Sequence, residues 1–235
     1  MKSNPEKLLR DNPYPGRGII IGRSEDNLHA IMLYFIMGRS PNSRNRIFEK
    51  TGDGIRTKAH DLSKMTDPSL VIYHPVRVFE GQTVVTNGDQ TDTVVEHLQK
   101  GQDFQTALRT REYEPDAPNY TPRISGLIEQ NGSYTISILK SADGNPQCCV
   151  RSFFEYAAPI AGTGHFISTY KTDGDPLPSF EGEPISVSID LKGGLKPFAE
   201  KIWNALNEEN KISLYAREID LSTSLSEEII LNKYI

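Results

Sequence analysis

Three polar segments of this 235-residue chain carry side chains that could bind or transform an anionic substrate. The first, residues 38–46, holds Arg39, Arg44 and Arg46 directly after the most apolar run of the sequence. Guanidinium groups bind phosphate or carboxylate through paired hydrogen bonds, so an anion site is one interpretation of this segment. A solvated basic loop accounts for it equally well.

The second segment, residues 86–93, reads Thr-Asn-Gly-Asp-Gln-Thr-Asp-Thr and lies between a predicted strand and a predicted helix. Backbone N–H groups at the start of a helix can hold an anion or the edge of a base. The same residue types build ordinary turns and helix N-caps, so capping alone also explains the segment.

The third segment, residues 112–124, contains three prolines that stiffen a loop leading into a strand. This loop carries Glu112, Glu114 and Asp116, and Arg123 lies near its end. A carboxylate within reach of an arginine can serve as a general base or can simply form an ion pair.

Motifs of several other classes are absent from the sequence. No G-x-G-x-x-G links a strand to a helix and no G-x-x-x-x-G-K-[ST] occurs, so neither a dinucleotide site nor a P-loop is predicted. The five histidines are scattered without metal-ligand spacing, so no metal site is predicted. The adjacent Cys148 and Cys149 are ill-suited to a standard disulfide, and no nearby histidine would activate either as a nucleophile.

The composition of the chain argues against nucleic acids and membranes as partners. The chain has 26 Lys and Arg against 31 Asp and Glu, a net charge of -5 without a basic run, which argues against nucleic-acid binding. The apolar run at residues 30–37 is less than half of the roughly 20 residues that a membrane-spanning helix needs. The first 16 residues carry charges where a signal peptide has an apolar run, so a cytoplasmic protein is predicted.

The elements that must position these segments are mostly strands. Residues 18–22 and 30–37 are short apolar runs bounded by turn-forming residues, a pattern typical of strands buried on both faces. Two pairs of alternating segments predict hairpins, the second with a type I′ turn. The pairs are residues 76–80 with 83–86 around Gly81-Gln82, and residues 123–130 with 133–142 around Asn131-Gly132.

Helices are predicted over residues 91–100 and 103–111, and a third begins near Lys196. Antiparallel hairpins with helices between them predict an α+β layered sandwich, because the regular strand-helix alternation of a doubly wound sheet is absent. The sequence has no internal repeat or low-complexity linker, which favours one continuous domain.

The residues and the order of several short motifs resemble those of the archaeal-type IMP cyclohydrolase family. The resemblance runs from Arg17 to about Glu218, over most of the chain. The matching strings are Arg39-Ser40 with Arg44, Asp67-Pro68 through Tyr73, Val84-Val85-Thr86-Asn87-Gly88 with Thr91-Asp92-Thr93, Tyr113-Glu114 with Asp116, Thr121-Pro122-Arg123-Ile124, Ile167-Ser168-Thr169-Tyr170 and Ala216-Arg217-Glu218.

The resemblance implies a fold and a reaction. The family's fold is similar to that of N-terminal-nucleophile hydrolases, a four-layer α-β-β-α sandwich, but without self-cleavage. Its reaction is the last step of purine synthesis, in which 5-formamidoimidazole-4-carboxamide ribotide loses water and becomes inosine 5′-monophosphate (IMP). No cofactor is implied, because both reacting groups lie on one substrate and the protein must mainly orient them. The implied partner is a purine nucleotide, and a homo-oligomer is compatible with the sequence.

Carried over position by position, the resemblance implies a catalytic set of Arg44, Tyr73 and Glu114. Glu114 is expected to transfer protons, Tyr73 to donate to the developing oxyanion, and Arg44 to orient Glu114 or the substrate. The implied contacts to the base, ribose or phosphate are Arg23, Asn87, Gly88, Thr91, Asp92, Thr121, Arg123, Ser168, Thr169 and Tyr170.

The chain also departs from the family pattern. Ser43 precedes Arg44 where the family has asparagine, which makes Arg46 a rival for the catalytic role. The segments outside the resemblance predict an N-terminal arm over residues 1–16, a catalytic domain over residues 17–220 and a C-terminal tail over residues 221–235.

Two other function classes stay open at this point. A purine-nucleotide-binding or regulatory protein would keep the pocket without the chemistry, although binding alone would not need the Glu114 carboxylate. An N-terminal-nucleophile amidohydrolase would need Ser, Thr or Cys at a mature N-terminus. Cleavage before Ser3 or Cys148 would provide one, and an intact mass would detect it.

Overall fold

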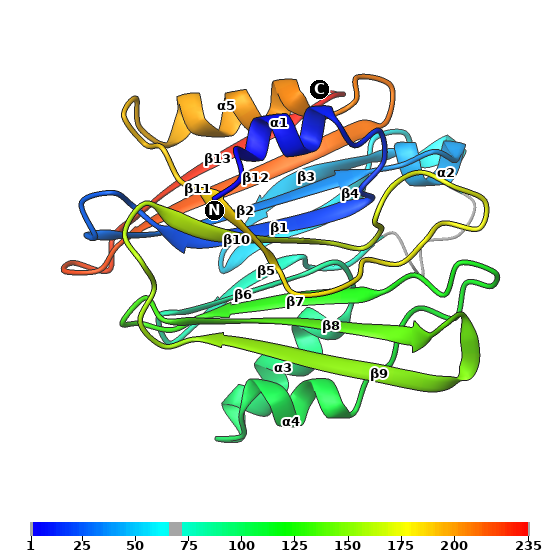
Figure 1. Ribbon diagram of the computed structural model, residues 1–235, viewed down its shortest axis with the longest axis horizontal. Helices are drawn as coiled ribbons and strands as arrows, with labels where there is room; N and C mark the ends of the chain where they lie inside the picture. Colours follow the sequence, from blue (N-terminus) through cyan, green and yellow to red (C-terminus); the bar gives the residue numbers. More distant parts are fainter. Residues whose placement is uncertain (1, 66–71, 235) are drawn as a thin grey trace.

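The computed structural model describes residues 2–65 and 72–234, whose strands form two antiparallel sheets (Figure 1). Asp67 and Pro68, part of one matching string, lie outside the described residues. Sheet A has the order β11-β10-β1-β2-β12-β13, with β1 (Arg17–Arg23), β2 (His29–Met37), β10 (Thr163–Ser168), β11 (Ile185–Ser188), β12 (Lys211–Asp220) and β13 (Ser226–Asn232). Sheet B has the order β3-β4-β5-β6-β7-β8-β9, with β3 (Arg46–Thr51), β4 (Gly54–Ala59), β5 (Val76–Phe79), β6 (Gln82–Thr86), β7 (Arg123–Ile128), β8 (Tyr134–Ala142) and β9 (Asn145–Tyr156).

Helices cover the outer faces of both sheets, which gives four layers (Figure 1). The prediction of an α+β layered fold is confirmed, and all three predicted helices form. Helices α1 (Pro5–Arg10) and α5 (Leu195–Ala205) lie on sheet A, whereas α3 (Gln90–Gln99) and α4 (Phe104–Arg109) lie on sheet B. Two further short helices, α2 (Pro41–Arg44) and the 3-10 helix η1 (Leu62–Lys64), lie in connections between strands.

Apolar side chains fill the spaces between these layers. In β1, Ile20 packs with Phe198 and Ile202 of α5, whereas its neighbours Ile19 and Ile21 belong to the core between the two sheets. Successive side chains of a strand point to opposite faces, so a strand covered on both sides must be apolar throughout. The prediction that β1 and β2 are buried on both faces is therefore confirmed.

Both predicted hairpins form, but their turns differ from the prediction. β5 and β6 are joined by Glu80 and Gly81, whose φ angles of 47° and 78° are those of a type I′ turn. The β7–β8 connection is longer, because Ile128 pairs with Tyr134. The type I′ turn predicted at Asn131-Gly132 is wrong: of these two residues only Gly132 has a positive φ, 77°, as in a longer loop that ends in a left-handed glycine.

The two terminal segments belong to the same layers as the rest. Helix α1 packs against α5 through Leu9, and β13 pairs with β12 along sheet A. Asn232 of β13 also reaches sheet B: its amide accepts a hydrogen bond from Phe48 N at 2.9 Å and donates one to Phe48 O at 3.0 Å. One side chain therefore joins β13 to β3, the edge strands of the two sheets.

Candidate functional site

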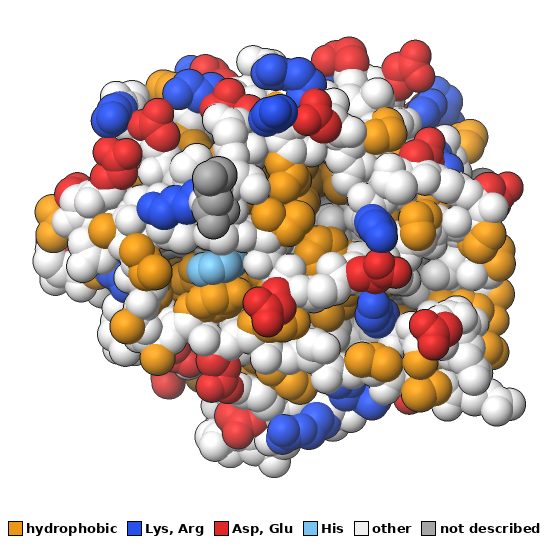
Figure 2. Space-filling model, viewed as in Figure 1, with side chains coloured by type: hydrophobic (Ala, Val, Ile, Leu, Met, Phe, Trp, Pro, Cys, Tyr) orange, Lys and Arg blue, Asp and Glu red, His pale blue; other side chains and the backbone are white. Residues whose placement is uncertain are grey.

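Three buried arginines mark one end of the sandwich. Arg17, Arg46 and Arg123 are the first residues of β1, β3 and β7, and they are 9%, 0% and 6% exposed. The charges of all three act on the carboxylate of Glu114. On the surface shown in Figure 2, by contrast, positive and negative side chains are interspersed. Buried positive charge in a chain of net charge -5 indicates a site for an anionic ligand.

Arg46 gives the clearest sign of a missing ligand. Its Nε donates to Ser43 O at 2.8 Å, but neither terminal nitrogen has a hydrogen-bond partner among the residues that the structure describes. Burial lowers the pKa of this guanidinium, and the positive charge of Arg17 lowers it further. Unpartnered donors on a buried cation are costly for a folded protein, and a bound anion would supply the missing partners.

Glu114 lies within reach of these charges and is 3% exposed. Burial raises the pKa of Glu114 above its ordinary value, although the positive charges of Arg17 and Arg123 act to lower it. Within residues 2–65 and 72–234, no hydrogen-bond donor contacts its carboxylate. A buried carboxylate with a raised pKa is suited to exchange a proton near neutral pH.

Two tyrosines complete the cluster. The hydroxyl groups of Tyr73 and Tyr34 lie 2.9 Å apart, and both side chains act electrostatically on Arg46. Burial raises the pKa of Tyr34 well above its ordinary value, so Tyr34 is a neutral hydroxyl at neutral pH. The hydrogen bond fixes the Tyr73 hydroxyl within electrostatic range of Arg46. When Tyr34 is the donor of this bond, the Tyr73 hydroxyl can donate to a ligand oxygen.

The structure does not bring Arg44 to this cluster. Arg44 closes α2, where its Nε donates to Gly38 O and a terminal nitrogen donates to Asn210 Oδ1, both at 3.0 Å. The side chain lines a surface hollow that also contains His60 and Tyr234. Of the two arginines that the sequence left as rivals, Arg46 is therefore the one that is electrostatically coupled to Tyr73.

Arg23 also lies elsewhere. It is the last residue of β1, and a six-residue step along a strand is roughly 20 Å, so Arg23 lies at the opposite end of the sandwich from Arg17. Its terminal nitrogen donates to Asn131 O at 3.4 Å in the β7–β8 connection. The structure therefore places Arg23 away from the cluster around Glu114.

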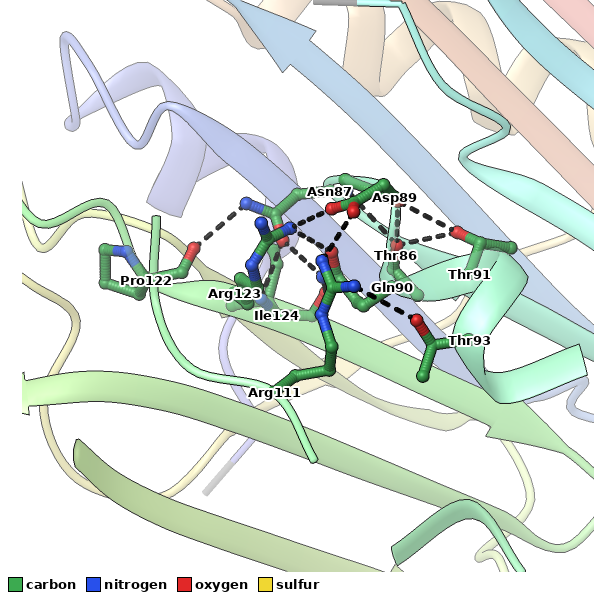
Figure 3. A network of polar contacts seen from close by, with 11 residues as sticks. Thr86, Asn87, Asp89, Gln90, Thr91, Thr93, Arg111, Pro122, Arg123 and Ile124 are labelled. Carbon is green, nitrogen blue, oxygen red and sulfur yellow. Dashed lines mark hydrogen bonds and ion pairs between the residues drawn. The ribbon is translucent and has the colours of Figure 1, made fainter. Parts of the chain in front are cut away.

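Asn87 and Gly88 lie close to Arg123, and Thr91 follows them at the start of α3 (Figure 3). The side-chain polar atoms of Asn87 and Thr91 already have partners within the protein. Asn87 Nδ2 donates to Pro122 O at 2.9 Å, and its Oδ1 accepts from Ile124 N at 2.8 Å and from the Gln90 side chain at 3.0 Å. The Thr91 hydroxyl bonds Thr86 Oγ1 at 2.7 Å. These residues hold the β6–α3 connection against the start of β7.

We expect Asn87→Ala to lower the free energy of unfolding by about 3 kcal/mol, because it leaves buried donors and an acceptor without partners. Chemical denaturation measures this loss. Asn131→Ala is the matched control: Asn131 accepts from Ser133 N at 2.9 Å in an exposed turn, where water replaces the lost bond. Equal losses in the two variants would contradict the structural role of Asn87.

Asp89, which the sequence did not single out, orients Arg123. Its carboxylate contacts Arg123 at 2.8 Å and Arg111 at 2.5 Å, and both arginines point toward it in Figure 3. Burial acts to raise the pKa of Asp89, but the hydrogen bond from Arg111 and the charge of Arg123 leave it below its ordinary value. Gln90 Oε1 accepts a further bond from the same terminal nitrogen of Arg123 at 2.6 Å, so two side chains fix this nitrogen.

Three of the remaining predicted substrate contacts bond other parts of the protein. Asp92 faces away, toward Arg77 at 3.1 Å and His74 at 3.7 Å. Ser168 and Thr169 are buried and bonded internally: Ser168 donates to Tyr170 O at 2.8 Å, and Thr169 Oγ1 accepts from Arg17 N at 3.1 Å. They fix the end of β10 against the start of β1.

Thr121 and Tyr170 lie at the cluster and bond each other, with 2.6 Å between the Thr121 hydroxyl and the Tyr170 hydroxyl.

The sequence alone did not identify Arg17 as a site residue, although its position directly before an apolar run was a usable signal. It also missed Tyr34, which is hidden inside the most apolar strand. An aromatic residue in such a run is indistinguishable from core until its hydroxyl partner is known.

Metal-ligating and thiol groups form no second site in the described part of the chain. No group of three or more His, Cys, Asp or Glu side chains among its residues could hold a metal ion. Cys148 and Cys149 are free thiols on the edge strand β9, exposed and half-buried respectively. Within the same residues no helix is long and apolar enough to cross a membrane.

Comparisons with known proteins agree on one family. A family model described as IMP cyclohydrolase-like protein matches residues 14–223. The chain is similar to the IMP cyclohydrolase of Methanopyrus kandleri, with 29% identity over 203 residues that cover 77% of this chain and 96% of that protein. It is 31% identical to the IMP cyclohydrolase of Methanocella arvoryzae over 126 residues, 52% of this chain and 60% of that protein. It is also 31% identical to the IMP cyclohydrolase of Halobacterium salinarum over 132 residues, which cover 54% of this chain and 63% of that protein.

Proposed function

Because the chain belongs to the IMP cyclohydrolase-like family, we propose that it closes the purine ring of 5-formamidoimidazole-4-carboxamide ribotide to give IMP. The carboxamide nitrogen attacks the formyl carbon, and the formyl oxygen takes up the proton that this nitrogen loses. The hydroxyl so formed then leaves as water with the proton of the formamido nitrogen. The reaction needs orientation of two groups on one substrate and two proton transfers, both of which side chains can provide.

The observation that carries this proposal is the buried set of Arg46, Tyr73 and Glu114. Glu114 accepts the proton of the attacking nitrogen, because it is a carboxylate whose pKa burial has raised. Tyr73 donates to the oxygen that becomes negative during attack, and the unpartnered nitrogens of Arg46 bind the same oxygen or the neighbouring carbonyl. Arg46 thus takes the role that the resemblance alone implied for Arg44.

Arg17 and Arg123 supply positive charge for the anionic ribotide. The Nε atoms of both are buried and unpartnered among the described residues. Arg123 is held in place by Asp89 and Gln90. Burial acts to lower the pKa of Arg17, but the charge of Glu114 together with the neighbouring tyrosines raises it above its ordinary value. We assign Asn87, Gly88 and Thr91 to the support of Arg123 rather than to substrate contact.

The proposal extends to the molecule as a whole. The order helix, sheet, sheet, helix supports a fold of the N-terminal-nucleophile hydrolase kind that has lost self-cleavage. Residues 17–220 would form the catalytic domain, with the two terminal segments as additions to its layers. A role in purine synthesis would place the protein in the cytoplasm with its nucleotide substrate.

Conversion of the ribotide tests the function directly. The purified protein is incubated with the formamido ribotide, and the hypoxanthine chromophore of IMP is followed against a blank without protein. We expect catalytic conversion at rates proportional to protein concentration. No conversion above the blank, together with tight binding of IMP, would instead identify a nucleotide-binding protein.

The rate of ring closure should depend on pH through Glu114. Glu114 faces Arg17 from β1, Arg46 from β3, Arg123 from β7 and Asp116 from its own loop. Because the ionised form accepts the proton, kcat should fall as the pH drops through the pKa of Glu114, which burial has raised above its ordinary value. A profile that stays flat down to the ordinary glutamate pKa would contradict this role.

A further inference from the structure

The carboxylate of Asp116 bridges the loop that carries Glu114. Glu114 N donates to Thr121 O at 2.9 Å, so the two ends of the loop face each other. Inside it, Asp116 Oδ1 accepts from Thr121 N at 2.6 Å, and Asp116 Oδ2 accepts from the Thr121 hydroxyl. The backbone oxygen of Asp116 accepts from Asn119 N at 3.0 Å. The position of Glu114 therefore depends on contacts that Asp116 makes on both its side chain and its backbone.

The directions of these hydrogen bonds can be worked out from the chemistry of the groups. An ionised carboxylate only accepts, so the Thr121 hydroxyl must donate its single proton to Asp116. Thr121 can then only accept from Tyr170, whose hydroxyl lies 2.6 Å away. Burial raises the pKa of Tyr170 to about 12, so its proton is present at neutral pH. The chain of donation runs from Tyr170 through Thr121 to Asp116.

This chain of donors links the Glu114 loop to the opposite sheet. Tyr170 follows β10 of sheet A, and its ring stacks on Tyr14 with the centroids 5.9 Å apart. Thr121 precedes β7 of sheet B by two residues. The hydroxyls of Thr121 and Tyr170 both have hydrogen-bond partners within this chain of donors. Neither hydroxyl therefore needs a substrate atom as its partner.

We propose that Asp116 is a positioning residue for the ring closure: through Thr121 and Tyr170 it fixes Glu114 between the two sheets. This inference rests on the function proposed above, because it assigns a role to the neighbour of the proton-accepting group. Thr121 and Tyr170, which the resemblance implied as substrate contacts, become members of the same positioning chain.

Asp116 also affects Glu114 electrostatically. This effect can be measured, and it distinguishes a positioning role of Asp116 from a purely structural one. Its negative charge raises the pKa of Glu114, opposing the arginines Arg17, Arg123 and Arg46 that face Glu114 from β1, β7 and β3. Removing the charge of Asp116 should therefore shift the acid limb of the rate profile to lower pH. Removing only the Thr121 hydroxyl leaves that charge in place and should not shift the limb.

The test compares Asp116→Asn and Thr121→Val with a matched control, Asp220→Asn. Asp220 also holds a turn, accepting from Ser222 N at 2.8 Å and from the Ser222 hydroxyl at 2.6 Å, but it ends β12 at the far end of the sandwich. We expect kcat to fall about 10- to 100-fold in both loop variants with little change in KM, since a small misplacement of a reacting group has effects of this size. The acid limb should move to lower pH in Asp116→Asn alone, and Asp220→Asn should match the wild type.

A readout without turnover keeps this inference separate from the proposed function. The carboxyl carbon of Glu114 is titrated by NMR in wild-type protein and in Asp116→Asn, both labelled with ¹³C-glutamate, with Glu114→Gln identifying the signal. A lower Glu114 pKa in Asp116→Asn supports the inference even if the ribotide is not converted, in which case only the proposed function fails. An unchanged Glu114 titration, or loop variants with the kcat of Asp220→Asn, would overturn it. If Asp116→Asn does not fold, the kcat of Thr121→Val decides.

Discussion

Glu114→Gln is expected to lower kcat by about 100- to 10,000-fold, the range over which a positioned general base contributes. Glutamine keeps the shape of the side chain, but its amide cannot take the proton of the attacking nitrogen. The loss should appear at saturating ribotide, because orientation by the arginines is left intact. Initial rates of IMP formation measure it.

The same substitution should leave stability intact. Burial raises the pKa of Glu114 in the folded state, so its contribution to stability is present at low pH and is lost as the pH rises through that pKa. At neutral pH a neutral isostere therefore costs nothing, and the free energy of unfolding should equal or exceed that of the wild type. Glu112→Gln is the control, since Glu112 is exposed and lies 3.6 Å from Arg151. A Glu114→Gln variant as fast as Glu112→Gln would remove Glu114 from the mechanism.

Arg46→Met should abolish most activity while making the protein more stable. Loss of the two unpartnered guanidinium nitrogens removes donors to the developing oxyanion, and we expect kcat/KM to fall by about 100- to 1,000-fold. Methionine fills a similar volume without a buried charge, so the free energy of unfolding should rise by roughly 1 kcal/mol or more. Steady-state kinetics and urea denaturation on the same preparation give both quantities.

Arg44→Met provides the comparison that the sequence could not settle. Arg44 bonds Gly38 O and Asn210, and within residues 2–65 and 72–234 it forms no hydrogen bond or ion pair with Tyr73 or Glu114. Its removal should lower stability and leave the rate of ring closure close to that of the wild type. The reverse pattern, with Arg44→Met inactive and Arg46→Met active, would return the catalytic role to Arg44.

Much of the fold could be predicted because its signals are local. The apolar runs at β1 and β2, the turn residues between β5 and β6, and the apolar stripe of α3 each identify an element within about ten residues of sequence. The exact turn in the β7–β8 hairpin could not be predicted, because Asn-Gly fits several loop lengths. The register that Ile128 and Tyr134 adopt decides among them.

The site was harder to predict because side-chain direction and hydrogen-bond occupancy are not local. Arg44 and Arg46 are two residues apart, but one ends α2 and the other begins β3, so their guanidinium groups diverge. Asn87 has the residue type of a ligand contact, and only the positions of Pro122 and Ile124, more than 30 residues away, reveal that both its amide nitrogen and its amide oxygen have partners.

The strand order has a consequence for the order in which the molecule assembles. Sheet B is built from one continuous stretch of sequence, β3 to β9, whereas sheet A joins β1 and β2 to strands that follow that stretch, from β10 onward. Gly18 pairs with Ser168, so closing this ladder brings together residues separated by the whole of sheet B. Non-local pairing of this kind slows folding, and sheet B can form its hairpins first. Arg46 and Arg123 would then be in place on sheet B before Arg17 arrives, and the positive end of the sandwich would be completed last.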